Sequence, residues 1–279
     1  MLRHVNRLRS AVYGIAIGDA LGLPVQFQSR DSYPEVTEMI KGELPWPAGT
    51  WSDDTSLTLA TVDSLLTCEG VDVPDMRARF MDWMDNGAYT QDGEAFDQGF
   101  TTVHALTHGR GCTNEQSNGN GSLMRILPLA FVKNLSDEQI AQVSGITHAH
   151  PLSVEACTVY VHAAQLILDG FSLTEALETA SLSSEIFSYL ADIGSKKRNE
   201  IRSTGYVKDS LEASFWCLLT TDNFRDALIR AVNLGDDTDT IGAITGGMAR
   251  LVYGMESVPD SWMNALRKKE IIERCLASQ

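Results

Sequence analysis

The 279-residue sequence lacks paired cysteines, a long apolar run and an excess of positive charge. Its cysteines are far apart and odd in number, which argues against a disulfide framework and against a structural zinc site; they are Cys68, Cys112, Cys157, Cys217 and Cys275. The apolar stretch after the basic N-terminus is interrupted by Asp19 and stays below the roughly 20 residues of a membrane span. We therefore expect a cytoplasmic protein without a membrane partner.

The charge balance excludes one broad class of partner. Asp and Glu number 37 against 22 Lys and Arg, which gives a formal net charge of −15. Such a field repels phosphate backbones, so we do not expect nucleic acid as a partner. The hydrophobic content of 43% and charged content of 21% are typical of a globular chain with a sizeable core.

Helical periodicity dominates, whereas strand-like alternation is scarce. Apolar residues recur at three- and four-residue steps in Arg3–Ala20, Leu57–Leu66, Ala95–His108, Val154–Leu168, Leu211–Leu219, Phe224–Val232, Thr240–Val252 and Trp262–Leu276. Capping boxes begin at Ser136 and Ser172, and Pro151 and Pro259 are placed at helix entries. The pattern predicts an all-α fold, a compact single-domain bundle over residues 1–279 with about ten or more helices.

Two stretches are predicted to be irregular. Ser29–Thr50 carries several prolines and glycines and is expected to be a cover loop. Gly109–Ser122 is rich in Gly and Asn and is expected to be a second loop that runs into an apolar helix.

Two acidic segments are the strongest chemical signal. Ser52, Asp53 and Asp54 precede an apolar helix, and Asp236, Asp237 and Asp239 cluster just before another. One such residue at a helix start is most often a cap, but three carboxylates exceed what a cap uses and repel one another without a cation. Carboxylates and hydroxyls without Cys or His suit Mg²⁺ or Mn²⁺. If the two segments meet, they could hold a pair of ions.

The histidines give weaker signals. His104 and His108 have helical spacing, but no Glu lies between them as in a zinc peptidase helix, so a structural or surface role is favoured. His148 and His150 lie beside a predicted helix entry. There, an imidazole that binds a polar ligand and an ordinary entry loop are equally compatible with the sequence.

Two glycine patterns have different interpretations. The glycines at 14, 18 and 22 match no nucleotide-binding fingerprint and favour close helix packing. The segment 118–125 is a better phosphate cradle, because its glycines let backbone N–H groups approach an anion. Arg125 would either assist there or be a buried structural arginine that pairs with one of the acidic clusters.

Together the motifs resemble the ADP-ribosylglycohydrolase family, which includes dinitrogenase-reductase-activating glycohydrolase and the ADP-ribosyl-acceptor hydrolases. The resemblance is carried, in order, by GIAIGDALGLPVQF (14–27), WSDDTSLTLA (51–60), FDQGFTT (96–102), NGNGSLMRILPLA (118–130), THAHP (147–151), TGYVKDSLEASFW (204–216) and AVNLGDDTDTIGAITGG (231–247). It implies an orthogonal helical bundle with a two-metal centre, and it covers nearly the whole chain.

The resemblance also implies roles for individual residues. The ligands of two Mg²⁺ or Mn²⁺ ions would be Ser52, Asp53, Asp54, Asp237, Asp239 and Thr240. Contacts to ADP-ribose would come from Asn120, Gly121, Ser122, Met124, His148 and Tyr206. Asp97 would lie at the reacting sugar, and Asp54 and Gln26 complete the expected catalytic set.

Gln26 departs from the family, where most members carry Glu at about this place. An amide cannot move a proton as a carboxyl can. Three outcomes are compatible with this change. Asp97 or a metal-bound water would take over, a glutamate of the cover loop (Glu35, Glu38 or Glu43) would reach in, or the protein would bind ADP-ribose without efficient turnover.

The resemblance thus implies a metal-dependent hydrolase that cleaves the N-glycosidic bond between ADP-ribose and an acceptor, arginine first. The expected partners are ADP-ribose and an ADP-ribosylated protein or small molecule, and we expect a monomer. Two alternatives stay open: an ADP-ribose-binding protein with weak or no turnover, and a metal-dependent phosphohydrolase that cleaves the diphosphate of a nucleotide.

Overall fold

Helices form nearly all the regular structure of the chain. The computed structural model describes residues 1–43, 45–254 and 258–277, and in these ranges there are isolated β-bridges but no β-strand. The α-helices are α1 (Val5–Gly22), α2 (Asp53–Thr67), α3 (Val73–Asn86), α4 (Phe100–His108), α5 (Asp137–Ser144), α6 (Pro151–Leu168), α7 (Leu173–Ser181), α8 (Val207–Leu219), α9 (Phe224–Val232), α10 (Thr238–Tyr253), α11 (Asp260–Ala265) and α12 (Lys269–Leu276). The 3-10 helices are η1 (Leu23–Val25), η2 (Glu115–Ser117), η3 (Leu123–Arg125), η4 (Leu127–Phe131), η5 (Leu190–Ser195) and η6 (Arg198–Glu200). The predicted all-α fold is confirmed.

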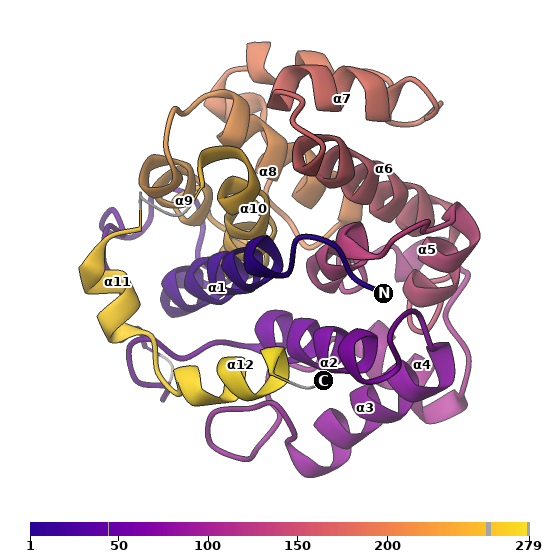
Figure 1. Ribbon diagram of the computed structural model, residues 1–279. Coiled ribbons are helices and arrows are strands. Elements are labelled where there is room, and N and C mark those ends of the chain that lie inside the picture. Colours follow the sequence, from indigo (N-terminus) through magenta and orange to yellow (C-terminus); the bar gives the residue numbers. More distant parts are fainter. Residues whose placement is uncertain (44, 255–257, 278–279) are drawn as a thin grey trace.

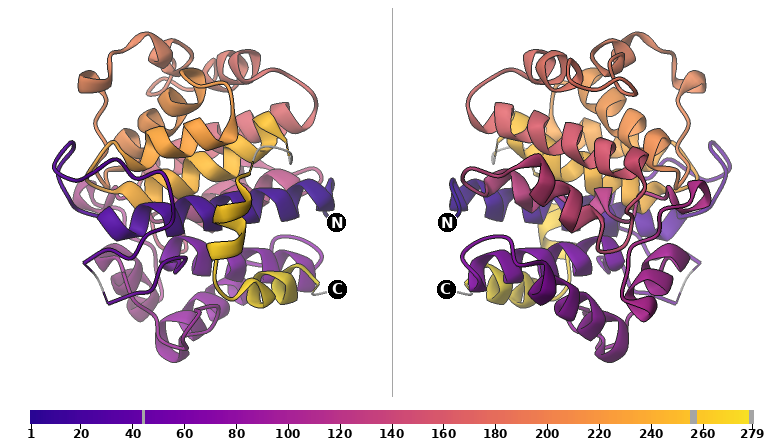
Figure 2. Two further views of the ribbon diagram at one scale, coloured as in Figure 1. Left: turned by 90° about the vertical axis from the view of Figure 1, so that its left-hand side faces the viewer. Right: turned by 90° about the vertical axis from the view of Figure 1, so that its right-hand side faces the viewer.

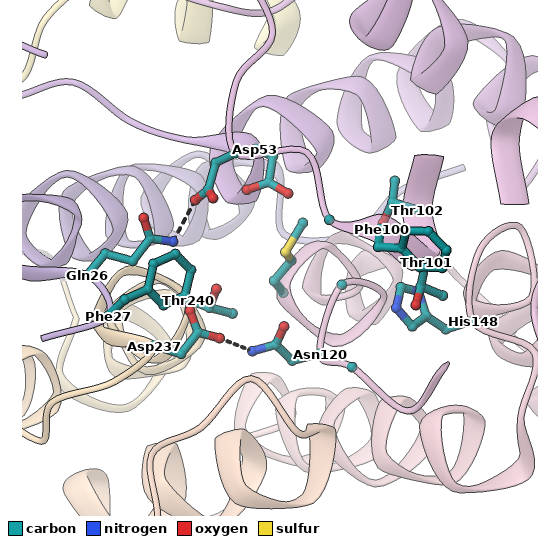
Figure 3. A pocket seen from close by; sticks show the side chains of 15 residues that line it. Gln26, Phe27, Asp53, Phe100, Thr101, Thr102, Asn120, His148, Asp237 and Thr240 are labelled. Carbon is teal, nitrogen blue, oxygen red and sulfur yellow. Dashed lines mark hydrogen bonds between the residues drawn. The ribbon is translucent and has the colours of Figure 1, made fainter. Parts of the chain in front are cut away.

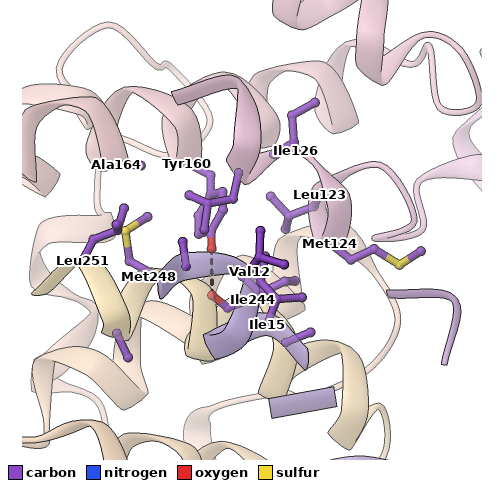
Figure 4. Close-up of a cluster of buried hydrophobic side chains, with 14 of the residues drawn as sticks. Val12, Ile15, Leu123, Met124, Ile126, Tyr160, Ala164, Ile244, Met248 and Leu251 are labelled. Carbon is purple, nitrogen blue, oxygen red and sulfur yellow. Dashed lines mark hydrogen bonds between the residues drawn. The ribbon is translucent and has the colours of Figure 1, made fainter. Parts of the chain in front are cut away.

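Helix α1 runs through the middle of the molecule (Figures 1 and 2). It packs most extensively on α10, which is flanked by α8 and α9. On its other side lies α2, which is in contact with α3 and α12. The buried side chains of α1, α6 and α10 meet in one apolar core, where the Tyr160 hydroxyl donates to the Ile244 carbonyl at 2.7 Å (Figure 4). The core therefore joins segments from both ends of the chain.

Glycines allow α1 and α10 to approach closely. The two helices run antiparallel, so Gly14, Gly18 and Gly22 face Gly246, Gly242 and Thr238 in turn. A Cβ on Gly18 would lie 1.9 Å from the Gly242 carbonyl oxygen, far inside van der Waals contact. The interpretation of these glycines as packing residues is confirmed.

We expect Gly18→Ala to destabilise the protein by on the order of 3 kcal/mol, because the backbones of α1 and α10 would have to separate. The change should appear as a lower urea midpoint in equilibrium unfolding. The matched control is Gly70→Ala, since a Cβ at Gly70 meets nothing within 4 Å. Equal stability of the two variants would contradict the close packing.

Two predicted helices differ clearly from the structure. The helix expected from Ala95 begins at Phe100, because Asp97 has a left-handed φ of 56° and Gly99 is the N-cap. The helix expected over Trp262–Leu276 is two helices, α11 and α12. Between them Arg267 leaves the helical path and binds Asp92 with both ends of its guanidinium, at 2.9 and 3.0 Å. Tertiary hydrogen bonds outweigh local periodicity here.

The sequence prediction also differs from the structure at α3 and in the segment after Ser122. Helix α3 was not predicted, although its buried residues Met76, Phe80 and Trp83 have helical spacing. The apolar segment after Ser122 forms the 3-10 helices η3 and η4 instead of an α-helix, and Pro128 lies in the first turn of η4. The cover loop has no helix in its described part; Leu44 of that prediction lies outside the described residues.

Helix α6 is the one described helix that is long and apolar enough to cross a membrane by length and composition. Its apolar side chains pack against α5, α7 and α8 inside the molecule. The apolar composition of α6 is therefore accounted for by its place in the core.

Candidate functional site

Three helix ends converge because α1 and α10 are antiparallel. The C-terminal end of α1 meets the N-terminal end of α10, where the Thr238 hydroxyl donates to the Gly22 carbonyl at 2.8 Å. The N-terminus of α2 joins them through Asp19. The partial positive charge of two helix N-termini thus faces the same place, where it favours carboxylates or an anionic ligand.

Asp19 fastens α1 to the start of α2. Its fully buried carboxylate accepts from the backbone N–H groups of Ser52 and Thr55, at 2.9 to 3.0 Å, and from the Thr55 hydroxyl at 2.6 Å. The predicted site did not include Asp19. The available signal was a lone acid within an otherwise apolar helix, GIAIGDALG, because a buried charge needs partners.

The two acidic segments meet at Asp19. One carboxylate oxygen each of Asp19, Asp54 and Asp239 lies within 4.8 Å of the others. Ser52 and Thr240 donate their hydroxyls to Asp54 Oδ2, at 2.9 and 3.4 Å. Asp54 Oδ1 and both oxygens of Asp239 are buried without a hydrogen-bond donor among the described residues. This cluster of Asp19, Asp54 and Asp239, which we call the acid cluster, therefore has free oxygen ligands.

The acid cluster is electrostatically strained. Burial raises the pKa of Asp54 and Asp239 well above the usual value, and the neighbouring carboxylates raise it further. Burial also raises the pKa of Asp19 to about 7, although its hydrogen bonds from Thr55 and Ser52 act in the opposite direction. Carboxylates brought together at this cost fit a divalent cation, and an all-oxygen set of this kind suits Mg²⁺ or Mn²⁺.

A pocket of about 230 Å³ lies beside the acid cluster, and Figure 3 shows the side chains that line it. Asp53, Asp237 and Thr240 line it, whereas Asp54 and Asp239 lie fully buried behind its wall. Burial, then nearby carboxylates, raise the pKa of Asp53 well above its usual value. Burial also raises the pKa of Asp237, although Asn120 donates to Asp237 Oδ2 at 2.6 Å. The six residues predicted as metal ligands thus lie close together. Three of them line the pocket, and the other three, Ser52, Asp54 and Asp239, are buried behind it.

Gln26 and Asp97 form a pair on the pocket wall. The Gln26 amide nitrogen donates to Asp97 Oδ2 at 2.6 Å, which leaves Gln26 Oε1 and Asp97 Oδ1 as acceptors (Figure 3). Two backbone hydrogen bonds with Asp236 hold the segment around Gln26. The Phe27 N–H donates to the Asp236 carbonyl at 2.6 Å, and the Asp236 N–H donates to the Gln28 carbonyl at 2.8 Å. The cover-loop glutamates at 35, 38 and 43 are exposed and do not line the pocket.

The glycine-rich loop borders the opposite side. Gly119, Asn120, Gly121 and Met124 line the pocket, and the Asn120 backbone donates to the Gly205 carbonyl at 3.0 Å. Ser122 is fully buried below the loop, with its hydroxyl bonded to that of Ser144 at 2.9 Å. The Ser122 side chain is therefore turned away from a ligand bound on the loop, and only its backbone could contact that ligand.

Arg125 is a buried structural residue, as one of the two sequence interpretations expects, but it has no acidic partner among the described residues. It is completely buried, donates to the Val143 carbonyl and the Thr147 hydroxyl at 3.2 and 2.9 Å, and lies 4.4 Å from the centre of the Phe80 ring. It does not line the pocket or form an ion pair with a described carboxylate. The expected phosphate contact and acidic partner are both wrong, because its side chain turns inward.

The histidines are divided between pocket and surface. His148 lines the pocket and is only 2% exposed, whereas His150 is the N-cap of α6 and accepts from Leu152 N at 3.1 Å. His104 and His108 are exposed with stacked rings, so they are surface residues. Tyr206 is 42% exposed beside the glycine-rich loop and is not among the residues that line the pocket.

Two aromatic side chains of the pocket were also missed. Phe27 and Phe100 line its mouth and are 73% and 82% exposed. Phe27 has a left-handed φ of 63°, which is costly for a bulky residue. Sequence offers little signal for either, because exposed aromatics cannot be distinguished from core residues by periodicity.

Comparison with known proteins identifies the family of the chain. A model of the family described as ADP-ribosylglycohydrolase matches residues 2–279. The chain is similar to ADP-ribosylarginine hydrolase Tri1 of Serratia proteamaculans, with 33% identity over 99% of this chain and 79% of the relative. It is similar to the ADP-ribosyl-[dinitrogen reductase] glycohydrolase of Rhodospirillum rubrum, with 29% identity over 98% of this chain and 94% of the relative. A solved ADP-ribosylglycohydrolase-related protein complex superposes with a TM-score of 0.81 and 29% identity, over 98% of this chain and 96% of that one.

Proposed function

Because the chain belongs to the ADP-ribosylglycohydrolase family, we propose that it hydrolyses the N-glycosidic bond between ADP-ribose and an arginine side chain. The observation that carries the proposal is that the acid cluster and the Gln26–Asp97 pair lie at the same pocket. Free carboxylate oxygens of the acid cluster are buried behind one side of it, and the Gln26–Asp97 pair lies on its wall. A sugar between them would have its hydroxyls toward the acid cluster and its leaving group toward Asp97.

The proposal includes two Mg²⁺ or Mn²⁺ ions, for which the acid cluster together with Asp53, Asp237 and Thr240 supplies the oxygen ligands. When bound, such ions orient the ribose hydroxyls and make water a better nucleophile. The residues of the chain hold this arrangement in place. Asn120 fixes the Asp237 carboxylate at 2.6 Å, and Ser52 fixes Asp54 at 2.9 Å.

The Gln26–Asp97 pair favours arginine as the leaving group. A guanidinium is already protonated near neutral pH. When its bond to the ribose C1″ breaks, the electron pair goes to nitrogen and a neutral guanidine departs, so no general acid is needed. Asp97 Oδ1 and Gln26 Oε1 would accept hydrogen bonds from the guanidinium and orient it. The alkoxide of a serine linkage needs a proton donor, which an amide at residue 26 cannot be.

The size of the pocket limits how ADP-ribose fits. Its 230 Å³ is less than the roughly 300 Å³ or more of typical small-molecule sites. The distal ribose would fill the pocket, and the diphosphate would extend over Asn120, Gly121 and Met124 toward His148. The exposed Tyr206 lies farther along the same loop, where the adenosine would pass. Glycines at 119 and 121 let backbone N–H groups approach the diphosphate.

The proposed partners are an ADP-ribosylated protein or small molecule and free ADP-ribose as product. The proposal keeps a cytoplasmic location, which the wide spacing of the cysteines supports, and a monomeric state.

Mass spectrometry of the products tests the proposal. The enzyme is incubated with arginine-linked and serine-linked ADP-ribose substrates, with Mg²⁺, Mn²⁺ or EDTA. We expect intact ADP-ribose from the arginine substrate only, and only with metal. AMP and ribose phosphate would instead identify a phosphohydrolase that cleaves the diphosphate.

A second candidate, an ADP-ribose-binding protein with little turnover, is favoured by Gln26 alone. We expect wild-type protein to turn over the arginine substrate. We expect Gln26→Glu to gain activity on the serine substrate, because a protonated carboxyl next to Asp97 can donate a proton. Calorimetry that finds tight ADP-ribose binding without arginine turnover, with turnover restored by Gln26→Glu, would support the binding protein instead.

A further inference from the structure

A buried row of polar groups ends at the pocket. Arg125 Nη2 donates to the Thr147 hydroxyl at 2.9 Å, and this hydroxyl is 2.8 Å from His148 Nδ1. The three side chains are between 0 and 2% exposed. His148 is the only one of the three that lines the pocket. The row therefore connects a buried cation to a ligand-facing imidazole.

Arg125 is an unusual residue to bury in this way. None of the ion pairs found among the described residues includes it, and its Nε and Nη1 have no hydrogen-bond partner there. Its guanidinium is compensated by the Val143 carbonyl, the Thr147 hydroxyl and the Phe80 ring. Burying a cation without a carboxylate costs folding free energy, which points to a role for Arg125 toward its neighbours.

The hydrogen bonds decide which nitrogen of His148 carries the proton. Arginine can only donate, so Thr147 Oγ1 accepts from Arg125 and keeps its own proton to donate. His148 Nδ1 is the only acceptor found for that proton among the described residues. The positive charge of Arg125 on the same side also favours the tautomer whose lone pair is on Nδ1. Both arguments place the ring proton on Nε2.

The Nε2 atom faces the pocket beside the glycine-rich loop. A Cβ added to Gly121 would lie 3.3 Å from His148 Nε2 and 2.8 Å from Cε1, and one added to Gly119 would lie 3.5 Å from Nε2. No hydrogen bond found among the described residues engages Nε2. The two glycines therefore leave this edge of the imidazole open to a ligand.

We propose that Arg125 and Thr147 are positioning residues that hold His148 as the neutral Nε2–H tautomer, so that its ring donates a hydrogen bond to an acceptor oxygen of the bound ligand. Burial, followed by the charge of Arg125, lowers the pKa of His148 to about 3, which is consistent with a ring that stays neutral. The identity of the ligand, ADP-ribose, rests on the proposed function, whereas the tautomer does not.

The tautomer is measured first, in ligand-free protein. Long-range ¹H–¹⁵N correlation spectra of histidine-labelled protein distinguish protonated from unprotonated ring nitrogens, and the spectrum of His148→Gln assigns the signals of His148. We expect a protonated Nε2 and an unprotonated Nδ1 in the wild type. A proton on Nδ1 would overturn the proposal, whether or not the protein is an ADP-ribose hydrolase.

The coupling to binding is then measured by calorimetry with ADP-ribose. Thr147→Val removes the hydroxyl at nearly constant volume, and we expect mixed tautomers of His148 and about threefold to tenfold weaker binding, as for the loss of one neutral hydrogen bond. Thr147→Ser keeps the hydroxyl and should restore both readouts.

Thr245→Val is the matched control, because Thr245 is equally buried and its hydroxyl has no partner among the described residues. It should leave the His148 spectrum and the affinity unchanged. If Thr147→Val folds with an unchanged His148 spectrum and unchanged affinity, the positioning role is wrong. If the wild type has the Nε2–H tautomer but does not bind ADP-ribose, the proposed ligand fails and the assigned tautomer stands.

Discussion

Replacing Asp239 with asparagine is expected to lower metal-dependent release of ADP-ribose at least about 1000-fold, since a bound ion contributes several kcal/mol to such reactions. Both carboxylate oxygens of Asp239 are buried without a donor, and one lies within 4.8 Å of oxygens of Asp19 and Asp54. Asparagine keeps the size of the side chain but provides one neutral oxygen. The cation would lose a charged ligand that no neighbouring group replaces.

The measurement is kcat/KM for an arginine-linked substrate over a titration of Mg²⁺ or Mn²⁺, together with the metal-induced rise in Tm. Wild-type protein should be stabilised by about 2.7 kcal/mol at a metal concentration 100 times Kd, and Asp239→Asn should lose this stabilisation. Asp85→Asn on the exposed face of α3 is the control for loss of one acidic charge. Full activity of Asp239→Asn would disprove a metal centre at the acid cluster.

The same cluster gives the metal-free protein a characteristic dependence of stability on pH. Asp19 has an ordinary pKa of 3.8 and a folded pKa of about 7, and the pKa values of Asp54 and Asp239 are also raised. Between these pH values the folded protein binds more protons than the unfolded chain, so its free energy of unfolding falls as pH rises. In EDTA, urea unfolding at pH 5 and pH 7.5 should reveal this fall. Saturating Mg²⁺ should remove most of it, because the cation takes the place of the protons.

Asp97→Asn is expected to lower kcat/KM for arginine-linked ADP-ribose by about 100-fold or more. Asp97 is the one carboxylate among the described lining residues that is not a proposed metal ligand, so the guanidinium would lose this charged acceptor. Asp97 is held by Gln26 at 2.6 Å, in a backbone conformation with φ of 56°. Asparagine at this position would also present its amide to the cationic leaving group in one of its two orientations. The loss should fall mainly on kcat if Asp97 acts on the departing guanidine.

Glu94→Gln is the control for Asp97→Asn, since Glu94 is exposed in the same loop and does not line the pocket. Steady-state kinetics with and without added guanidine provides a second readout. An unchanged kcat/KM in Asp97→Asn would remove Asp97 from the site and would leave the arginine preference without a residue to explain it.

Much of the fold could be predicted because helix formation is largely local. The capping boxes at Ser136 and Ser172 form as the sequence indicates, and Pro151 occupies the first turn of α6. The exceptions depend on distant partners. Arg267 breaks the last predicted helix to bind Asp92, which is 175 residues away.

The sequence predicts which types of residue form the site better than it predicts where each side chain lies. Asp53 and Asp237 reach the pocket, whereas Asp54 and Asp239 are placed behind it, and no spacing rule distinguishes neighbours in this way. For Arg125 the sequence left open a phosphate contact and a buried position, and the structure places the side chain in the core. The direction of a side chain in a 3-10 turn depends on the packing around it, which local sequence does not contain.

By itself the sequence determined the helical class, the two acidic segments and the family resemblance, because periodicity, caps and ordered motifs are readable along the chain. Only the tertiary structure decided that Asp19 completes the acid cluster, that Gln26 pairs with Asp97, and that His148 is backed by Thr147 and Arg125. For the acid cluster, the physical reason is the close antiparallel packing of α1 on α10 through facing glycines. It brings residues more than 200 positions apart within hydrogen-bonding distance, as in Thr238 and Gly22.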